Sequence, residues 1–141
     1  MKIANLLLIT LVLITSACSS IQSSGGTLPL PSEWKLVSFG KAGAEAPVVE
    51  GSSVTLKFDV DGQAGGSGGC NSYGAKYETQ GHNLAIKELI STLMACLDEQ
   101  VNQQESQYFA ALQAATKYEI SGDNLTIYYD DGQSQLSFTK Q

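Results

Sequence analysis

The chain of 141 residues contains 14 acidic and 8 basic residues, and its formal net charge is −6 at pH 7. This length is typical of a single domain of about 100–150 residues. Because the acidic residues are spread along the chain, the charge argues against a nucleic-acid-binding protein and against electrostatic docking on anionic lipid.

Residues 1–17 have the pattern of an export signal. Lys2 supplies the positive charge, and the apolar stretch Leu6–Ile14 is too short to span a bilayer. The small residues Ser16-Ala17 stand directly before Cys18. This arrangement resembles a bacterial lipobox and predicts a lipoprotein signal peptide, with acylation of the Cys18 thiol as the membrane anchor.

Residues 18–31 follow the signal as a Ser-, Gly- and Pro-rich stretch without periodicity, which predicts an acylated Cys and a flexible tether. Residues 32–141 then form the folded domain. Ser19, rather than Asp, follows the acylated Cys, as in lipoproteins that are sorted onward to the outer membrane. We therefore expect a lipid-anchored protein of the cell outer membrane that faces the periplasm.

Two further cysteines, Cys70 and Cys96, are separated by 26 positions. In an oxidising compartment an even pair forms a disulfide more often than a metal site. Closing this loop would stabilise the fold by about 3.5 kcal/mol in the chain-entropy model. Two buried free thiols are the alternative.

Alternating apolar and polar residues predict several short strands. The clearest begins at Val54, which shares one face with Leu56 and Phe58. Asp61-Gly62 and Asp130-Asp131-Gly132 are turn sequences typical of β-hairpins. The expected strands are 34–39, 54–59, 75–79, 84–87, 118–121, 125–129 and 135–138.

One segment has helical rather than strand periodicity. From Asp98 to about Thr116 an apolar stripe recurs at helical spacing, and no Gly or Pro interrupts it. The polar face carries Gln and Glu in place of Lys and Arg, which favours packing on the sheet over binding to a lipid surface. The predicted fold is α+β, with a strongly curved, barrel-like antiparallel sheet and one long helix inserted between strands.

No pattern of catalytic or metal-binding residues emerges from the rest of the chain. The run 65–71 is rich in Gly but has no phosphate-loop ending, so we expect a flexible loop or bulge there. His82 lies in a predicted turn, and one His with two paired Cys leaves too few ligands for zinc. We expect no metal, no cofactor and no enzymatic activity.

Glu105 lies on the apolar stripe of the predicted helix. A carboxylate that is buried there needs hydrogen-bond donors. A structural partner such as a Tyr, or backbone N–H groups near the loop at Cys70 and Asn71, is favoured over general-acid chemistry, because no second catalytic carboxylate is evident.

The runs 69–73 and 89–96, followed by Glu105 and Tyr108, resemble the META/HslJ domain family. The resemblance covers about residues 32–140, with Ala75 where the family commonly has Gly. It implies a small α+β fold with a disulfide, and it implies no catalytic residues. The matching positions, expected to be structural, are Cys70, Asn71, Thr92, Met94, Cys96, Glu105 and Tyr108.

The resemblance and the expected anchor lead to one main functional hypothesis. The protein would support envelope integrity, or tolerance to stress and to antibiotics of the novobiocin type, by contacting an envelope protein. The alternative is a binding module for a small apolar ligand in the concave sheet, with an enzyme least favoured. The aromatic residues that could line such a site, or could instead be core residues, are Tyr77, Tyr128, Tyr129 and Phe138.

Overall fold

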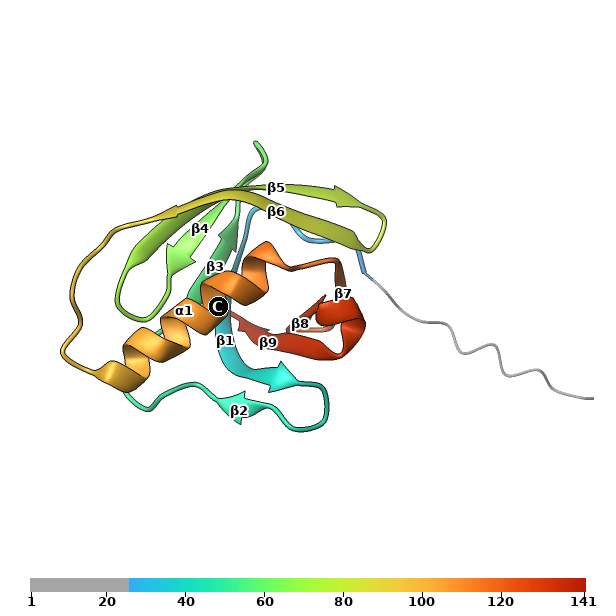
Figure 1. Ribbon diagram of the computed structural model, residues 1–141. Coiled ribbons are helices and arrows are strands. Elements are labelled where there is room, and N and C mark those ends of the chain that lie inside the picture. Colours follow the sequence, from blue (N-terminus) through green and yellow to red (C-terminus); the bar gives the residue numbers. More distant parts are fainter. Residues whose placement is uncertain (1–25) are drawn as a thin grey trace, which may run out of the picture.

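A computed structural model describes residues 26–141, so the expected signal peptide and Cys18 lie outside the described residues. Figure 1 shows a curved sheet with an α-helix across its open side. The elements in chain order are β1 (Ser32–Lys41), β2 (Ala46–Pro47), β3 (Thr55–Phe58), β4 (Gln63–Ser67), β5 (Ser72–Gln80), β6 (Asn83–Ser91), α1 (Glu99–Gln113), β7 (Lys117–Ser121), β8 (Asn124–Tyr129), the 3₁₀ turn η1 (Asp130–Gly132) and β9 (Ser134–Lys140).

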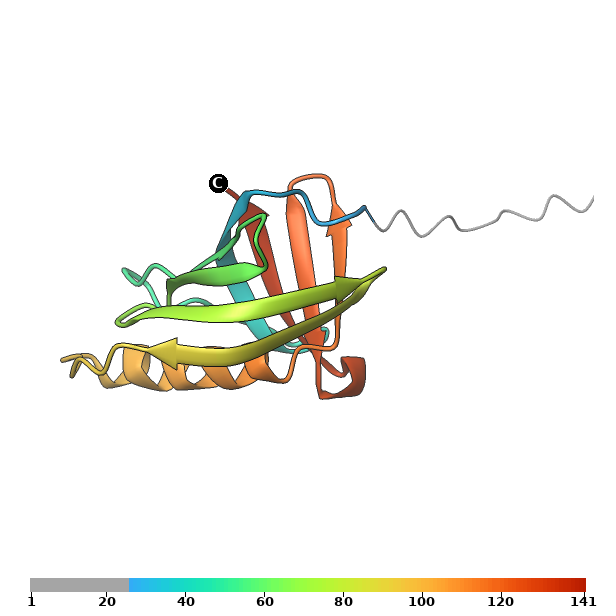
Figure 2. The same cartoon turned by 90° about the horizontal axis from the view of Figure 1, so that it is seen from above.

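All strands of the described residues belong to one antiparallel sheet that bends into a ring. Their order is β2-β1-β3-β4-β5-β6-β7-β8-β9, and β9 also pairs with β1. Between β6 and β7 the ladder is reduced to one pair, Asn83 with Lys117. Helix α1 connects these two strands and lies along β6 (Figures 1 and 2). The predicted fold class is therefore confirmed: a strongly curved antiparallel sheet with one helix inserted between strands.

The interior of the ring is filled by apolar side chains from most strands and from α1. Val54, Leu56 and Phe58 are buried on one face, as their alternation predicts. Burial of this kind, at about 25 cal/mol per Å² of apolar surface, is the main source of stability. The largest fully buried side chains are Trp34, Tyr108, Phe58, Phe138, Leu56, Leu112, Leu125, Ile127, Leu136 and Val54.

Helix α1 begins one residue after Asp98, whose side chain caps it. The carboxylate of Asp98 accepts hydrogen bonds from the backbone N–H groups of Gln100, at 2.8 Å, and Val101, at 3.3 Å. Such a cap contributes about 1 kcal/mol. The helix ends at Gln113, before the predicted end at Thr116, because the backbone of Thr116 is hydrogen-bonded to the sheet. The Thr116 N–H donates to the Tyr128 carbonyl oxygen at 3.0 Å.

Two segments differ from the sequence-based expectation. The expected glycine loop at 65–71 begins instead as strand β4, in which Gly65 and Gly66 pair with β5. Glycine is needed at position 66 because a Cβ there would collide with the carbonyl of Thr55. The expected tether extends to residue 31, yet Leu28 packs on the core and its N–H donates to the Tyr118 hydroxyl at 3.2 Å.

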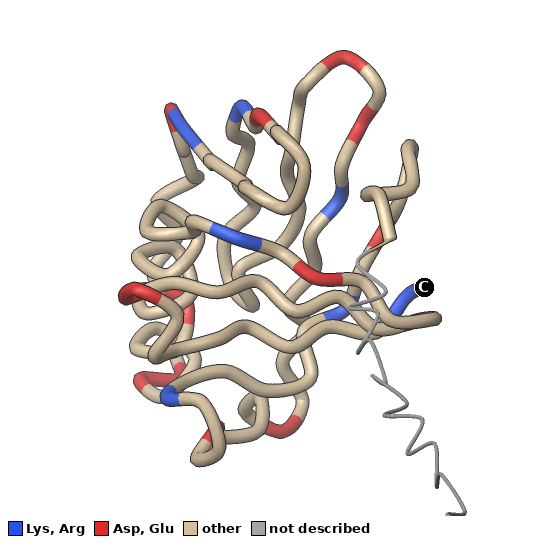
Figure 3. The backbone as a smooth tube through the Cα atoms, turned by 90° about the vertical axis from the view of Figure 1, so that its right-hand side faces the viewer, with Lys and Arg blue, Asp and Glu red and all other residues tan. Residues whose placement is uncertain are grey.

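Charged residues of both signs are interspersed over the described chain (Figure 3). Ion pairs such as Lys76–Glu88, at 2.6 Å, and Lys87–Glu78, at 2.7 Å, join exposed side chains. Exposed pairs of this type contribute at most about 1 kcal/mol each. None of the helices within residues 26–141 is long and apolar enough to cross a membrane.

Candidate functional site

The buried carboxylate of Glu105 is the centre of a hydrogen-bonded node between α1 and the turn that connects β4 and β5. Its Oε2 accepts hydrogen bonds from the backbone N–H groups of Asn71, at 2.6 Å, and Cys70, at 3.1 Å. Its Oε1 accepts from the side-chain amide of Asn71 at 2.6 Å. These three donors replace the water that the carboxylate loses on burial, and the arrangement is the one expected for a structural Glu105.

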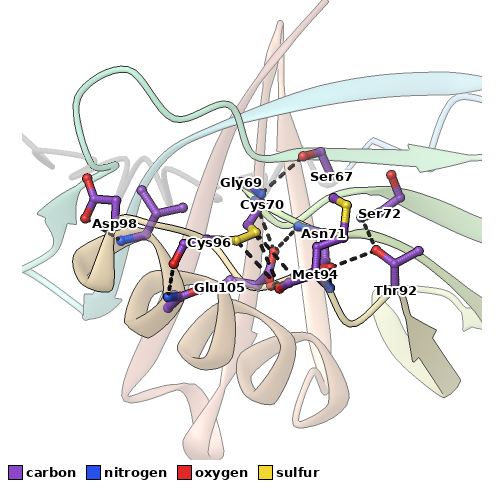
Figure 4. Close-up of a disulfide and its surroundings, with 12 residues drawn as sticks. Ser67, Gly69, Cys70, Asn71, Ser72, Thr92, Met94, Cys96, Asp98 and Glu105 are labelled. Atoms are coloured by element: carbon purple, nitrogen blue, oxygen red, sulfur yellow. Dashed lines mark hydrogen bonds between the residues drawn. A yellow bond between two sulfur atoms is a disulfide. The ribbon is translucent and has the colours of Figure 1, made fainter.

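Asn71 links the node to the connection between β6 and α1 through hydrogen bonds of its side chain (Figure 4). Its Oδ1 accepts hydrogen bonds from the Met94 N–H, at 2.7 Å, and from the Thr92 hydroxyl, at 2.8 Å. Its Nδ2 also lies 3.4 Å from the Met94 carbonyl oxygen. One buried amide therefore fixes the backbone of a segment that follows it by more than twenty residues.

A disulfide between Cys70 and Cys96 closes the node on its outer side (Figure 4). The two Cα atoms lie 6.2 Å apart, and the predicted disulfide is confirmed. The side-chain amide of Asn102 on α1 donates to the Cys96 carbonyl oxygen at 3.0 Å. The segment 92–98 is thus held at residues 92, 94 and 96.

The glycines before Cys70 let α1 approach the turn closely. A Cβ added at Gly68 would lie 2.6 Å from Glu105 Oε2 and 2.6 Å from the ring of Phe109. Gly69 has a φ of +111°, a conformation that favours glycine. The two glycines therefore allow Glu105 to be buried, because no side chain separates its carboxylate from the backbone N–H groups of the turn.

Tyr108, the remaining motif residue, lies one helical turn below Glu105 in the core. Its hydroxyl lies 2.8 Å from the hydroxyl of Tyr73, which in turn lies 2.9 Å from the Thr55 carbonyl oxygen. The two rings meet edge to face with centroids 5.8 Å apart. Burial raises the pKa of Tyr108 and of Tyr73 well above the usual tyrosine range, so both hydroxyls are neutral at any physiological pH.

The four aromatic residues considered for an apolar ligand lie in different surroundings. Phe138 is in the core, and Tyr77 is buried against Phe58 with its hydroxyl 2.6 Å from the Asp59 carbonyl oxygen. Tyr128 is half-buried and donates to a carboxylate oxygen of Glu119 at 3.0 Å. The four residues therefore do not line one site.

Tyr129, the last of these four, borders an open hollow of about 470 Å³. The rest of its wall comes from β1, from the C-terminal part of α1 and from the start of η1, and consists of Phe39, Gly40, Gln107, Ala110, Ala111, Ala114 and Asp130. As for metal binding, residues 26–141 contain no group of three or more His, Cys, Asp or Glu side chains that could hold an ion.

The sequence does not predict one feature beside the node, a set of exposed apolar side chains at the end of β6 and on the β6–α1 connection. Leu93 is 95% exposed, Leu97 is fully exposed, and Ile90 and Met94 are 74% and 60% exposed. We call these four side chains the apolar loop. Their composition resembles that of a buried segment, so only the structure shows that they point outward.

The ring-like sheet, the single helix and the disulfide-bonded node define a small α+β domain. The META domain profile matches residues 27–141, and the chain therefore belongs to the META domain family. This confirms the resemblance drawn from the sequence motifs. A comparison with curated proteins found no match.

Solved structures share this fold at low sequence identity. A protein from Burkholderia xenovorans, solved by NMR, is 24% identical with a TM-score of 0.67, over 85% of this chain and 96% of that chain. A crystal structure of a DUF4847 family protein from Bacteroides vulgatus is 16% identical with a TM-score of 0.59, over 77% of this chain and 92% of that chain. At these identities the likeness concerns the fold alone.

Proposed function

We propose that this protein is a non-enzymatic lipoprotein of the bacterial outer membrane, anchored through Cys18 and facing the periplasm. Its META domain supports envelope integrity under stress, including tolerance to antibiotics of the novobiocin type, by contacting another envelope protein. The N-terminal signal with its lipobox-like end supports the location. The family and the fold are compatible with this role but do not define it.

The observation that carries the proposal is that the polar side chains of the family motif are bonded to other parts of the domain and hold its loops in place. Glu105 and Asn71 are 7% and 6% exposed, and their side-chain atoms bond to one another, to the turn at Cys70 and to the segment at Met94. Within residues 26–141 no buried side-chain nitrogen or oxygen lacks a hydrogen-bond partner. Groups that are all engaged in holding loops favour a binding scaffold over a reaction centre.

The alternative of a small apolar ligand has weaker support. The interior of the ring contains Trp34, Phe58, Tyr108 and Phe138, all of them fully or almost fully buried. A ligand in the concave side of the sheet would have to displace these side chains. Ligand sites are usually preformed hollows, so the filled interior favours a protein-contacting surface.

Mass spectrometry of the protein extracted gently from its own membranes tests the anchor and the ligand together. The expected denatured mass begins at Cys18 with attached acyl chains and with two hydrogens fewer for the Cys70–Cys96 bond. The native spectrum is expected to show no stoichiometric small molecule. An unacylated chain that retains residues 1–17 would refute the anchor, and a bound small molecule would favour the alternative.

A deletion strain tests the physiological role. We expect it to be more sensitive than its parent to heat, detergent or novobiocin, and we expect full complementation by the wild-type gene. A Cys18→Ser version should complement poorly, although its domain is unchanged. A deletion strain that is indistinguishable from its parent under all three challenges would count against the proposal.

A further inference from the structure

The apolar loop exposes hydrophobic side chains where a monomeric domain normally has polar ones. Leu93 and Leu97 are almost completely in contact with water, and Ile90 and Met94 extend the same exposed segment. Single exposed apolar residues are common, but four of them within residues 90–97 are typical of an interaction site. The group is therefore a candidate contact surface.

The loop is ordered by contacts that leave these side chains free. The Thr92 and Met94 backbones are bonded by their N–H groups to the Ser72 carbonyl oxygen, at 3.0 Å, and to Asn71 Oδ1, at 2.7 Å. The disulfide and the bond from Asn102 hold Cys96. Because the backbone is fixed before any partner arrives, little conformational entropy is lost on binding, which is the advantage of preorganisation.

The charges around the apolar loop indicate the character of its partner. Asp98 and Glu99 follow Leu97 directly and are exposed, and the stretch 88–116 contains no Lys or Arg. The other two acidic residues of this stretch add little to the surface charge, because Glu88 pairs with Lys76 and Glu105 is buried. Anionic lipid headgroups would be repelled by this surface. A protein recess with apolar walls and a basic border would be complementary to it.

The position of the anchor also favours a protein partner, and this step rests on the proposed lipid anchor at Cys18. Only residues 19–25 separate Cys18 from the described chain, and the bonds from Cys18 to Gly26 reach at most about 28 Å when fully extended. The domain's N-terminal segment is held at β7 by the bond from Leu28 to Tyr118. Figures 1 and 2 both show this segment at the opposite end of the domain from the β6–α1 connection. A short anchor at the N-terminal end therefore favours contact of the apolar loop with a protein rather than with the membrane that holds the anchor.

We propose that the apolar loop is the docking surface by which this protein binds an envelope protein. The partner would present an apolar recess bordered by Lys or Arg side chains. Leu93 and Leu97 would insert into the recess, and Asp98 and Glu99 would face its basic border. The Asn71–Glu105 node and the disulfide would position the loop without touching the partner.

Site-specific photo-crosslinking in cells tests this assignment on the full-length protein. We would replace Leu93 with the crosslinker p-benzoylphenylalanine and, as a control, place the same crosslinker at Val60. Val60 is 74% exposed, is also flanked by acidic residues and lies in the β3–β4 turn. We expect one discrete protein adduct from position 93 and not from position 60, with the linked peptide apolar and adjacent to Lys or Arg.

Four other outcomes would overturn the assignment. They are an adduct to phospholipid, an adduct to a second copy of this chain, identical adducts from both positions, and no adduct from position 93. If acylation of Cys18 and the deletion phenotype are established independently, these outcomes refute the docking surface and leave the proposed function in place. A missing anchor or phenotype would instead refute the proposed function.

Binding of the purified partner identified in this way gives the second test. Leu93→Ser combined with Leu97→Ser should weaken the affinity at least about tenfold, as truncation of central interface residues does. Val60→Ser should leave it unchanged. Because both leucines are exposed, the double variant should unfold at the same denaturant concentration as the wild type, so lost binding could not be attributed to lost folding. Equal affinities of the two variants would refute the proposal.

Discussion

Replacing Glu105 with Gln is the sharpest perturbation of the node, because it keeps the shape of the side chain and removes its charge and one acceptor. The Gln oxygen can still accept from the N–H groups of Cys70 and Asn71. Its NH₂ group, however, would face the NH₂ group of Asn71, where Oε1 now accepts at 2.6 Å. If the Asn71 amide rotated by 180°, its oxygen could accept from the Gln, but its NH₂ group would then face the Met94 N–H, which now donates to Asn71 Oδ1.

The expected cost follows from the bonds that are lost. One hydrogen bond to a charged acceptor disappears, two others become neutral, and one buried donor is left without a partner. We expect a loss of about 2–4 kcal/mol in the free energy of unfolding. Asn71→Asp alone should cost about 3 kcal/mol or more, because it would place two buried carboxylates against one another.

The combined exchange, Asn71→Asp with Glu105→Gln, should restore most of the complementarity, because only the long contact of Asn71 Nδ2 with the Met94 carbonyl oxygen, at 3.4 Å, is not replaced. The Asp carboxylate can accept from the Met94 N–H, from the Thr92 hydroxyl and from the new Gln amide. Urea unfolding followed by the fluorescence of Trp34, the single and fully buried tryptophan, measures all four proteins. The double variant should be more stable than the sum of the two single losses predicts by about 2 kcal/mol or more.

Two results would refute this reasoning. One is a Glu105→Gln variant within about 0.5 kcal/mol of the wild type, which is the ordinary range for surface substitutions. The other is simple additivity in the double variant, which would mean that the Asn71 and Glu105 side chains do not depend on one another.

Three further predictions concern the surroundings of the node. Gly68→Ala should lower the free energy of unfolding by about 1–3 kcal/mol, because the added methyl group would be overpacked against Glu105. Gly74→Ala is the control: a Cβ there meets nothing within 4 Å, so the same urea titration should show a change of less than about 0.5 kcal/mol. Replacing both cysteines of the disulfide with Ser should cost about 3.5 kcal/mol, and equal midpoints for the two proteins would contradict this. Because burial raises the pKa of Tyr108, its contribution is constant below the unfolded pKa of about 10 and falls by about 1.4 kcal/mol per pH unit above it. Tyr108→Phe should therefore flatten the alkaline loss of stability, as measured by unfolding between pH 9 and pH 11.

Local sequence patterns are sufficient to predict most elements of this fold. The alternation at Val54, Leu56 and Phe58 marks a strand with one buried face, and the apolar stripe marks α1. The backbone N–H partners of Glu105 also follow from the sequence, because a carboxylate on a buried face must find donors and the Gly-rich turn offers free N–H groups. The third donor, the side-chain amide of Asn71, is not predicted from the sequence.

Other features depend on contacts between distant segments. The pairing of β1 with β9, which closes the ring, joins the two ends of the domain and has no local sequence signal. Strand β4 has a glycine-rich sequence of low strand propensity, and its place in the sheet is set by its neighbours. The exposure of Leu93 follows from the bonds of Asn71 to Thr92 and Met94 on either side of it, so periodicity alone could not distinguish it from a core residue.

Amide hydrogen exchange at Met94 tests most directly whether the motif is a node that orders the apolar loop. We expect the Met94 N–H, bonded to Asn71 Oδ1 at 2.7 Å, to exchange as slowly as the amides of α1. In Glu105→Gln the same amide should exchange faster while the strand amides of β8 change little. A Met94 amide that exchanges at the unprotected rate in the wild-type protein would show that the loop is not held, and would contradict both the node and the docking surface built on it.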